Sequence, residues 1–260
     1  MTARRPSKIL LSVVKALFIR ELNSKMSVGR LGLFWTFFEP FMQVSMFILI
    51  RVALMGSGEG SNFDFAVFMA VGFIAFNMFR SIFSGSNGAF TANKALFTYK
   101  QVKPIDTLIA RALVNVFITS IIVLLFIFIG FFIQYEITPQ NILMVFFGYM
   151  WLLLFAFAVG LVVAIGSTFF DSIGKIIGIF SFGLMIFSAV FYPMISLPPE
   201  AQDVLLYNPL VHFMEMIHGY YIPELDDRFV DYRYMALWTI TPLFMGTWLY
   251  IKLEKRIISE

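Results

Sequence analysis

The chain carries apolar runs that are much longer than the core-facing stripe of a soluble helix. Hydropathy divides them into six segments, each near the ~20 residues that a helix needs to cross the hydrocarbon of a bilayer. The expected spans are residues 31–54, 65–83, 108–133, 142–169, 173–191 and 235–251. Lipid cannot hydrogen-bond to backbone groups, so every span has to be helical. The sequence predicts an all-α integral membrane protein with six transmembrane helices.

Composition agrees with this class. Of the 260 residues, 60% are hydrophobic and 13% are charged, which is typical of a membrane protein and not of a soluble domain. The chain has no cysteine, which excludes disulfides and thiolate metal sites.

Basic residues are divided unequally between the loops. If both termini are cytosolic, the inner side carries sixteen Lys or Arg, and the outer side carries only Arg51, Arg228 and Arg233. Acidic residues gather on the outer side. Because positive charge stays on the cytosolic side, six spans with both ends inside is the consistent topology. The basic balance is therefore a topology signal, and we expect no nucleic-acid partner.

Three segments outside the spans stand out. Residues 8–25 interrupt apolar residues with charge at helical spacing, which predicts an amphipathic helix on the membrane surface. The inner loop, residues 85–111, has a helix-compatible stretch at residues 89–99. The outer segment, residues 191–227, is too apolar for a solvated loop and too rich in proline for one span, which favours a segment that re-enters the outer leaflet or caps a cavity.

Sequence motifs limit the chemistry of the chain. It has no G-x-x-x-x-G-K-[ST] motif, so it cannot bind and hydrolyse ATP through a P-loop of its own. His212, Glu215 and His218 in "HFMEMIH" lie at i, i+3 and i+6, so a metal site is conceivable, although a Met-rich amphipathic stretch explains them better. The aspartates of "DDRFVD" are similar to those of lipid-phosphate enzymes, but a solvated acidic loop is the favoured interpretation.

Glu39-Pro40 lies some two turns inside the first expected span. A carboxylate and a helix breaker are both costly in hydrocarbon. We expect the proline to loosen this span near its inner mouth and the carboxylate to face a cavity or a basic partner. By contrast, Arg51, Arg80 and Arg111 lie near expected span ends, where their side chains can reach the membrane surface.

Three stretches resemble one family of transporters. They are "GRLGLFWTFFEPF" (residues 29–41), "FYPMISLPPEAQDVLLYNP" (191–209) and "NPLVHFMEMI" (208–217). Their order and the six-span topology are similar to ABC-2 type permeases, and in particular to the inner-membrane component of capsular polysaccharide exporters. His218 stands where many relatives have Arg.

The resemblance implies a single ABC-2 type transmembrane domain over residues 1–260, with no catalytic residue, cofactor or metal of its own. Its parts would be a cytoplasmic interface helix (1–30), five spans (31–191), a periplasmic gate region (192–232), and the last span with a cytoplasmic tail (233–260). The chain would form a homodimer with two copies of a separate ATPase, which binds ATP and Mg²⁺. Its substrate would be a lipid-linked capsular polysaccharide, passed to periplasmic and outer-membrane export components from the bacterial inner membrane.

The resemblance also assigns roles to residues. The stretch at residues 89–102 would be the coupling helix, with Ala89, Lys94, Phe97 and Tyr99 at the ATPase. The expected periplasmic gate residues are Pro193, Pro198, Asn208, Pro209, His212 and Glu215.

A canal for sugar polymers needs aromatic faces and small polar groups. The expected canal residues are Phe34, Trp35, Phe38, Glu39, Tyr149, Trp151 and Tyr192. The alternative is that these aromatic residues fill membrane helices or form interface belts.

Other functions remain open at this point. Export of O-antigen or teichoic acid is the near alternative within the same family. Outside it, a secondary exporter would show midplane ionisable relays or repeated halves. A membrane enzyme acting on lipid-linked intermediates would need convergent acids and bases, whereas here most acids lie outside and most bases inside.

Overall fold

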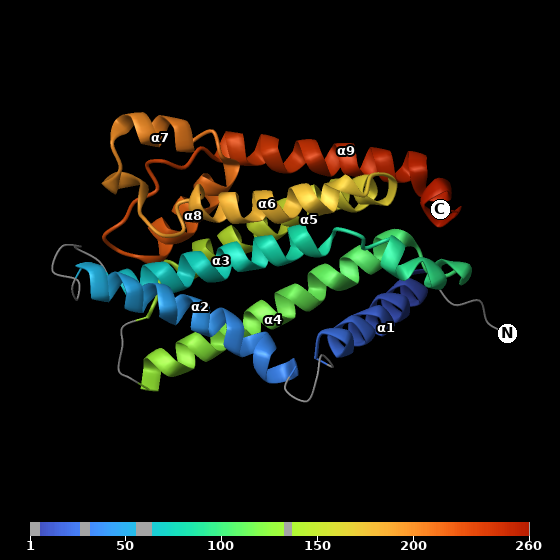
Figure 1. Ribbon diagram of the computed structural model, residues 1–260, viewed down its shortest axis with the longest axis horizontal. Coiled ribbons are helices and arrows are strands. Elements are labelled where there is room, and N and C mark those ends of the chain that lie inside the picture. The colour runs from blue at the N-terminus through green and yellow to red at the C-terminus, as the bar shows by residue number, and fades with distance from the viewer. Residues whose placement is uncertain (1–5, 27–31, 56–63, 133–136, 260) are drawn as a thin grey trace.

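The computed structural model describes residues 6–26, 32–55, 64–132 and 137–259, and within these ranges every regular element is a helix (Figure 1). The elements are α1 (Pro6–Met26), α2 (Gly32–Met55), α3 (Phe65–Gly85), η1 (Thr91–Thr98), α4 (Pro104–Phe132), α5 (Ile142–Phe169), α6 (Ser172–Ile186), η2 (Met194–Ser196), α7 (Pro199–Leu205), α8 (Pro209–Tyr221) and α9 (Tyr232–Ser259). The all-α prediction is confirmed for the described residues.

Three of the helices are long and apolar enough to cross a membrane among the residues described: α3, α4 and α5. They coincide with three expected spans. Side-chain caps fix where two of them begin. Asp64 accepts hydrogen bonds from the amides of Ala66 and Val67, and Asn141 accepts one from Met144. Each cap satisfies backbone donors that the first helical turn leaves free.

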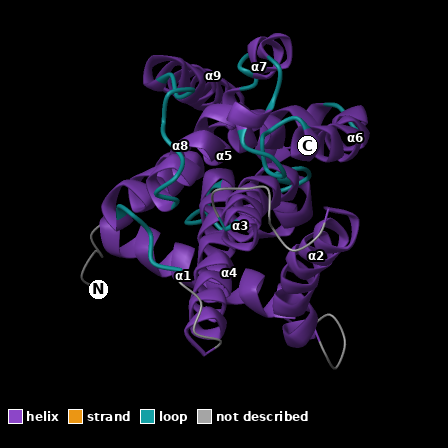
Figure 2. Ribbon diagram, turned by 90° about the vertical axis from the view of Figure 1, so that its left-hand side faces the viewer, coloured by secondary structure: helices purple, strands orange, loops and turns teal. Residues whose placement is uncertain are grey.

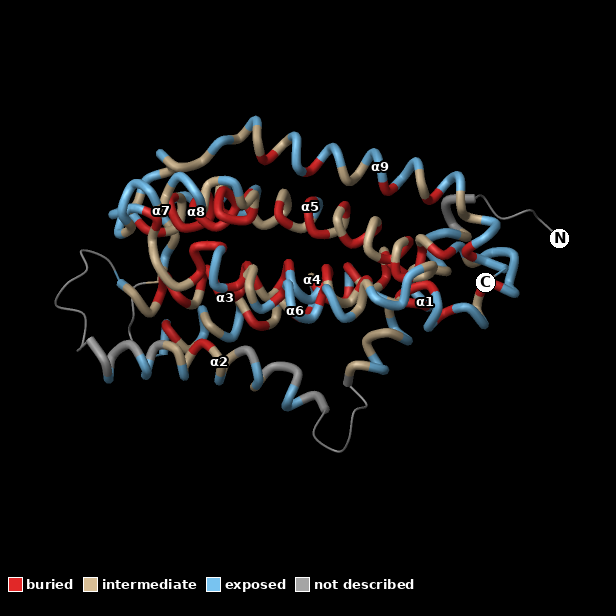
Figure 3. Tube along the Cα trace, turned by 45° about the horizontal axis from the view of Figure 1, so that its top comes forward, coloured by how far each residue is buried: buried red, intermediate tan, exposed pale blue. Residues whose placement is uncertain are grey.

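The long helices lie side by side along the long axis of the molecule (Figure 1). Viewed from one end, α5 lies near the centre of the helix bundle and α2 lies at its edge (Figure 2). Helix α5 packs against α9, α3 and α8, and α1 packs along α4. The largest core cluster joins α3, α5 and α8. Most residues of α3 and α8 are buried, whereas one side of α9 is exposed (Figure 3).

The exposed side of α9 is apolar. Leu237, Ile240, Phe244, Trp248 and Ile251 recur every three or four residues, and each is at least half exposed. An apolar stripe that faces outward at helical spacing is the surface expected for a helix in lipid.

Some element boundaries differ from the expected ones. The fifth span was expected to reach residue 191, but α6 ends at Ile186. Beyond it, Ala189 adopts a positive φ of 55° that L-residues rarely adopt, so the chain turns away before the proline-rich segment. The helix-compatible inner stretch forms a short 3₁₀ helix, η1. Helix α9 begins three residues before the expected span and continues eight residues past it.

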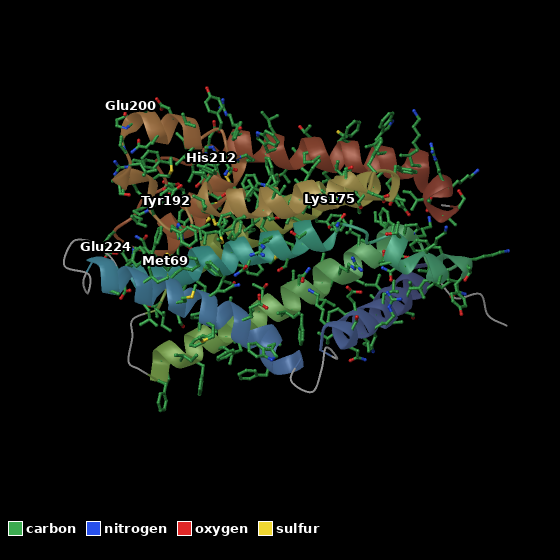
Figure 4. All side chains as sticks on the ribbon, viewed as in Figure 1. Met69, Lys175, Tyr192, Glu200, His212 and Glu224 are labelled. Carbon is green, nitrogen blue, oxygen red and sulfur yellow. The ribbon has the colours of Figure 1, made fainter. Side chains whose placement is uncertain are left out.

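Different elements lie at the two ends of the bundle. The start of α1, the end of α9 and η1 lie at one end, and α7 and α8 lie at the other (Figure 1). Tyr192, Glu200, His212 and Glu224 gather at the end that carries α7, whereas Lys175 lies toward the opposite end (Figure 4). We call these the inner and outer ends.

Candidate functional site

A polar cavity of about 550 Å³ lies between α2, α3, α4 and α6, with Lys25 of α1 at its wall. Its polar lining residues are Lys25, Glu39, Gln43, Asn77, Arg80, Ser81, Ser84, Asn115, Thr119 and Ser181. Polar and ionisable groups at the depth of membrane-spanning helices are costly unless they face one another or water. This polar cavity is therefore the strongest candidate for a functional site.

The polar residues that line the cavity are spaced at helical intervals, so those of each helix lie on one face. Asn77, Arg80, Ser81 and Ser84 lie at i, i+3, i+4 and i+7, on one face of α3. The rest of that helix is buried and mostly apolar. Asn115 and Thr119 lie one turn apart on α4, and Glu39 and Gln43 do the same on α2.

Hydrogen bonds cross the polar cavity between elements. Lys25 Nζ donates to Asn115 Oδ1 at 2.6 Å, and the hydroxyls of Ser84 and Ser181 lie 3.2 Å apart. The amide nitrogen of Asn77 is buried and has no hydrogen-bond partner in the part of the chain that the structure describes. Such a group indicates a site that a ligand or water completes.

Glu39 lines the polar cavity, where its carboxylate accepts a 3.5 Å hydrogen bond from Gln43. The neighbouring Phe34 and Phe38 line a second pocket, the apolar groove, of about 280 Å³ between α2 and α4. Trp35 is exposed beside them and contacts both rings edge-on. Four of the expected canal residues are therefore neighbours on α2.

The other expected canal residues lie elsewhere. The Tyr149 hydroxyl donates to the backbone oxygen of Val71, and the Trp151 indole donates to the Thr239 hydroxyl within the packed core. The Tyr192 hydroxyl donates to the carbonyl of Ile186 at the outer end. None of these three aromatic side chains lines the polar cavity.

Sequence reasoning missed most of the polar cavity. Its placement of Arg80 near a span end agrees with the end of α3 at Gly85 and with the exposure of Arg80, but it gave no role to Asn77, Asn115 or Thr119. The available signal was the polar stripe at i, i+3, i+4 and i+7 in an otherwise apolar span, which marks one helix face.

At the inner end, η1 presents exposed and buried residues in turn. Lys94 and Tyr99 are exposed, and Tyr99 keeps 66% of its surface accessible. Ala89 and Phe97 are buried in a cluster that includes Leu108 of α4. In this conformation Ala89 and Phe97 therefore anchor the segment, and only Lys94 and Tyr99 of the four expected coupling residues can reach a partner.

Polar contacts tie α1 to η1 and α4. Arg20 hydrogen-bonds to the side chain of Asn93 in η1. Glu21 pairs with Arg111 of α4, which also donates to the carbonyl of Gly85 at the end of α3. The Arg111 side chain is thus held inside the protein instead of reaching toward the membrane surface.

At the outer end, the expected gate residues hold the backbone of the broken segment. Asn208 caps α8 by accepting from the amide of Leu210, and its amide group donates to the carbonyl of Phe187. Pro209 is the first residue of α8, and Pro193 and Pro198 precede η2 and α7. The buried Glu215 carboxylate accepts from the amide of Met194 at 3.2 Å. Burial raises the pKa of Glu215 to about 7.

The two histidines of this segment, His212 and His218, make different contacts. His212 Nε2 donates to the carbonyl of Leu206, and Nδ1 accepts from the amide of Asp231. The His218 ring stacks on Phe68 at 3.9 Å and fills the space beside Gly72. Within the described ranges no three or more His, Asp or Glu are grouped so that they could hold a metal ion.

The aspartates of "DDRFVD" hold the loop before α9. Asp226 pairs with Arg228, Asp227 accepts from the hydroxyls of Tyr220 and Tyr232, and Asp231 caps the start of α9. They point to different partners, so they do not form an enzyme's metal site.

Comparisons with known proteins agree with the sequence resemblance. Residues 12–221 match the family model described as ABC-2 type transporter. The chain is 33% identical to the polysialic acid transport protein KpsM of Escherichia coli, over 99% of this chain and 100% of that protein. It is 29% identical to the capsule polysaccharide export inner-membrane protein BexB of Haemophilus influenzae, over 89% and 86% of the two chains. It is 24% identical to the corresponding protein CtrC of Neisseria meningitidis, over 94% and 92%.

Proposed function

The chain belongs to the ABC-2 type transporter family, and we propose that it is the permease subunit of an ABC exporter that moves lipid-linked capsular polysaccharide across the bacterial inner membrane. The observation that carries the proposal is the match to KpsM over essentially the full length of both proteins. The proteins named above act on polysialic acid or capsule polysaccharide, which favours capsule over O-antigen or teichoic acid.

The energy source lies outside the chain, because a membrane subunit of this family works with a separate ATPase. ATP and Mg²⁺ bind to that partner. The exposed face of η1, with Lys94 and Tyr99, is the proposed docking surface. The buried Ala89 and Phe97 would transmit its displacement into the bundle, because they pack against α4 and α5.

The proposed topology has six spans, formed by α2, α3, α4, α5, α6 and α9, with both termini in the cytoplasm. The common position of the start of α1 and the end of α9 supports it. Helix α1 would lie along the inner surface as the interface helix, and residues 192–232 would form the periplasmic gate. The whole of residues 1–260 is then one transmembrane domain.

The polymer would pass between two copies of the chain, and periplasmic and outer-membrane components would receive it. Exposed apolar side chains on α2 and α6, such as Leu49, Ile179 and Phe182, supply surfaces for pairing. The polar cavity, with Glu39 at its edge, would belong to the route because its amides and hydroxyls can replace water around sugar groups. When the two ATPase subunits bind ATP and close on each other, they would push on η1. The permease helices would then shift, because the ATPase makes different contacts with the open and closed states of the permease.

The test is deletion of the gene in an encapsulated host. Long polysaccharide should accumulate in the cytosol while synthesis continues, and a plasmid copy should restore the surface polymer. A Glu39→Gln copy should restore it less well, with the same amount of protein in the membrane. Unchanged surface polymer in the deletion strain would refute export by this chain.

A further inference from the structure

Helix α6 is held to the rest of the bundle along one narrow face. Within this helix, which the structure describes in full, only Ile177, Ser181 and Met185 are buried, and they recur every four positions. The outward side is exposed and includes Ile179 and Phe182. A helix that packs along one stripe has few buried contacts, so it can slide along its neighbours at lower cost than an enclosed helix.

The inner end of α6 lies against the turn at residues 86–90, which leads into η1 and which we call the inner turn. Within it, Gly88 adopts a positive φ of 63° and donates its amide hydrogen to the Ser167 hydroxyl at the end of α5. The Asn87 side chain lies beside Gly174 of α6, where an added Cβ would come within 2.8 Å of the Asn87 amide nitrogen. The first turn of α6 therefore contacts the segment that precedes the proposed docking surface for the ATPase.

The outer end of α6 is bound to the proline-rich segment at its last carbonyls. The final turn of a helix leaves carbonyl groups without partners inside the helix. The Tyr192 hydroxyl donates to the carbonyl of Ile186 at 2.7 Å. Asn208 Nδ2 donates to the carbonyl of Phe187 at 2.8 Å and to the Ser188 hydroxyl oxygen at 3.0 Å. Two side chains of the outer segment thus hold the end of α6.

Asn208 holds α6 and α8 at the same time. Its Oδ1 accepts from the amide of Leu210, which caps the first turn of α8. Helix α8 is buried from Leu210 to Gly219 and packs against α3, α5 and α9. A displacement of α6 therefore reaches a buried helix through a single side chain.

We propose that α6 carries displacement of the inner turn to the outer segment, and that Asn208 is the positioning residue that passes it from α6 to α8. The origin of the displacement rests on the proposed function, in which the ATPase pushes on η1. An amide side chain suits this link because it donates and accepts at once, so α6 and α8 separate only when its hydrogen bonds to one of them break. The outer segment then opens only when α6 moves.

The first test follows one buried position of α8 in the full chain with its ATPase, in right-side-out membrane vesicles loaded with or without ATP. The chain has no cysteine, so Val211→Cys, at a fully buried position, supplies a single thiol. A membrane-impermeant maleimide added outside should label it severalfold faster with ATP than without. Tyr207→Cys, at a position that is 79% exposed, should label equally fast under both conditions.

The variant Asn208→Asp separates the link from the helix cap. Aspartate still accepts from the amide of Leu210 as a cap, but it cannot donate to the end of α6. Added to the Val211→Cys protein, it should abolish the ATP-dependent increase in labelling while labelling without ATP stays slow. A change that merely loosens the outer segment would instead make labelling fast without ATP.

The second measurement is the amount of polymer exported per ATP hydrolysed. Asn208→Asp should lower this ratio by roughly tenfold, because two hydrogen bonds between α6 and the outer segment are lost, with the same amounts of folded permease and bound ATPase. Asn141→Asp makes the same change at the cap of α5, where the side chain accepts from the amide of Met144, and should leave the ratio unchanged. Tyr192→Phe removes the other tie and should lower the ratio by a smaller factor.

Any of three results would overturn the inference: no ATP-dependent increase in labelling when Asn208 is present, a preserved increase in Asn208→Asp, or an unchanged export ratio in that variant. Failure of the proposed function is read separately, from surface polymer in the deletion strain. If deletion abolishes surface polymer and Asn208→Asp exports normally, only the link through α6 is refuted.

Discussion

Glu21 Oε1 lies 3.0 Å from Nε of Arg111, with both side chains less than one-fifth exposed. A carboxylate of α1 is thereby paired with a guanidinium near the inner end of a membrane-spanning helix. The same guanidinium donates to the carbonyl of Gly85, so the Arg111 side chain joins α4 to both α1 and α3.

We expect Arg111→Met to destabilise the protein by roughly 2–4 kcal/mol, because it leaves the Glu21 carboxylate without its counter-ion in a partly buried site. Thermal unfolding of detergent-purified protein measures this. The double variant Glu21→Met, Arg111→Met should recover much of the loss. If the loss of stability in the double variant equals the sum of the losses in Glu21→Met and Arg111→Met, the two side chains are not coupled.

Gly72→Ala should loosen the contact between α3 and α8. A Cβ at this position would lie 2.6 Å from His218 Nε2, so the ring has to move, at a cost of roughly 1–3 kcal/mol. Gly178→Ala is the matched control, since its Cβ would meet nothing within 4 Å. It should be neutral or stabilising because alanine favours the helix. Equal unfolding temperatures for the two variants would contradict this packing.

Glu215 should make the outer end less stable as pH rises. Its pKa in the folded protein is about 7, above the ordinary 4.5, because of burial, which the amide of Met194 opposes. The folded state therefore binds the proton more tightly. The resulting stabilisation is fully present below pH 4.5 and is lost as pH rises through about 7, in total on the order of 3 kcal/mol.

The measurement for Glu215 is the unfolding temperature at pH 5.5 and pH 8, compared with Glu215→Gln. The amide stays neutral, so this variant should lose the component of the pH dependence that Glu215 causes, and it should exceed the wild type in stability at pH 8. Parallel pH profiles for the two proteins would show that Glu215 is not the titrating group.

Lys94→Glu with Tyr99→Ala should reduce copurification of the ATPase by roughly tenfold or more without changing the amount of folded permease, since both side chains are exposed. Lys255→Glu, another exposed lysine near the inner end, is the control. Phe97→Ala should act differently, by lowering the amount of folded protein, because it empties a buried site. Normal ATPase binding by the double variant would place the docking surface elsewhere.

The sequence predicted the parts of the fold that local chemistry determines. The expected span 142–169 agrees with α5, which is Ile142–Phe169. The helix begins there because Asn141 caps its first turn, ahead of a continuous apolar run. Helix α3 begins at Phe65 for the same reason, with Asp64 as its cap. The end of α6 was not predicted, since the backbone turn at Ala189 leaves no signature in an apolar stretch.

The candidate site was predictable only in part. Glu39 stood out because a carboxylate inside a span is rare. Asn77 and Asn115 lie in different helices, and only packing brings α3 and α4 together around Lys25. Burial of Phe97 likewise depends on residues from α4, α5 and α9, which no local pattern indicates.

The most direct test is transport by the purified permease and its ATPase, reconstituted in vesicles that hold labelled lipid-linked polymer on the nucleotide-accessible side. The account predicts that polymer crosses only when both proteins and hydrolysable ATP are present. Transport by the permease alone, without ATPase or nucleotide, would contradict it.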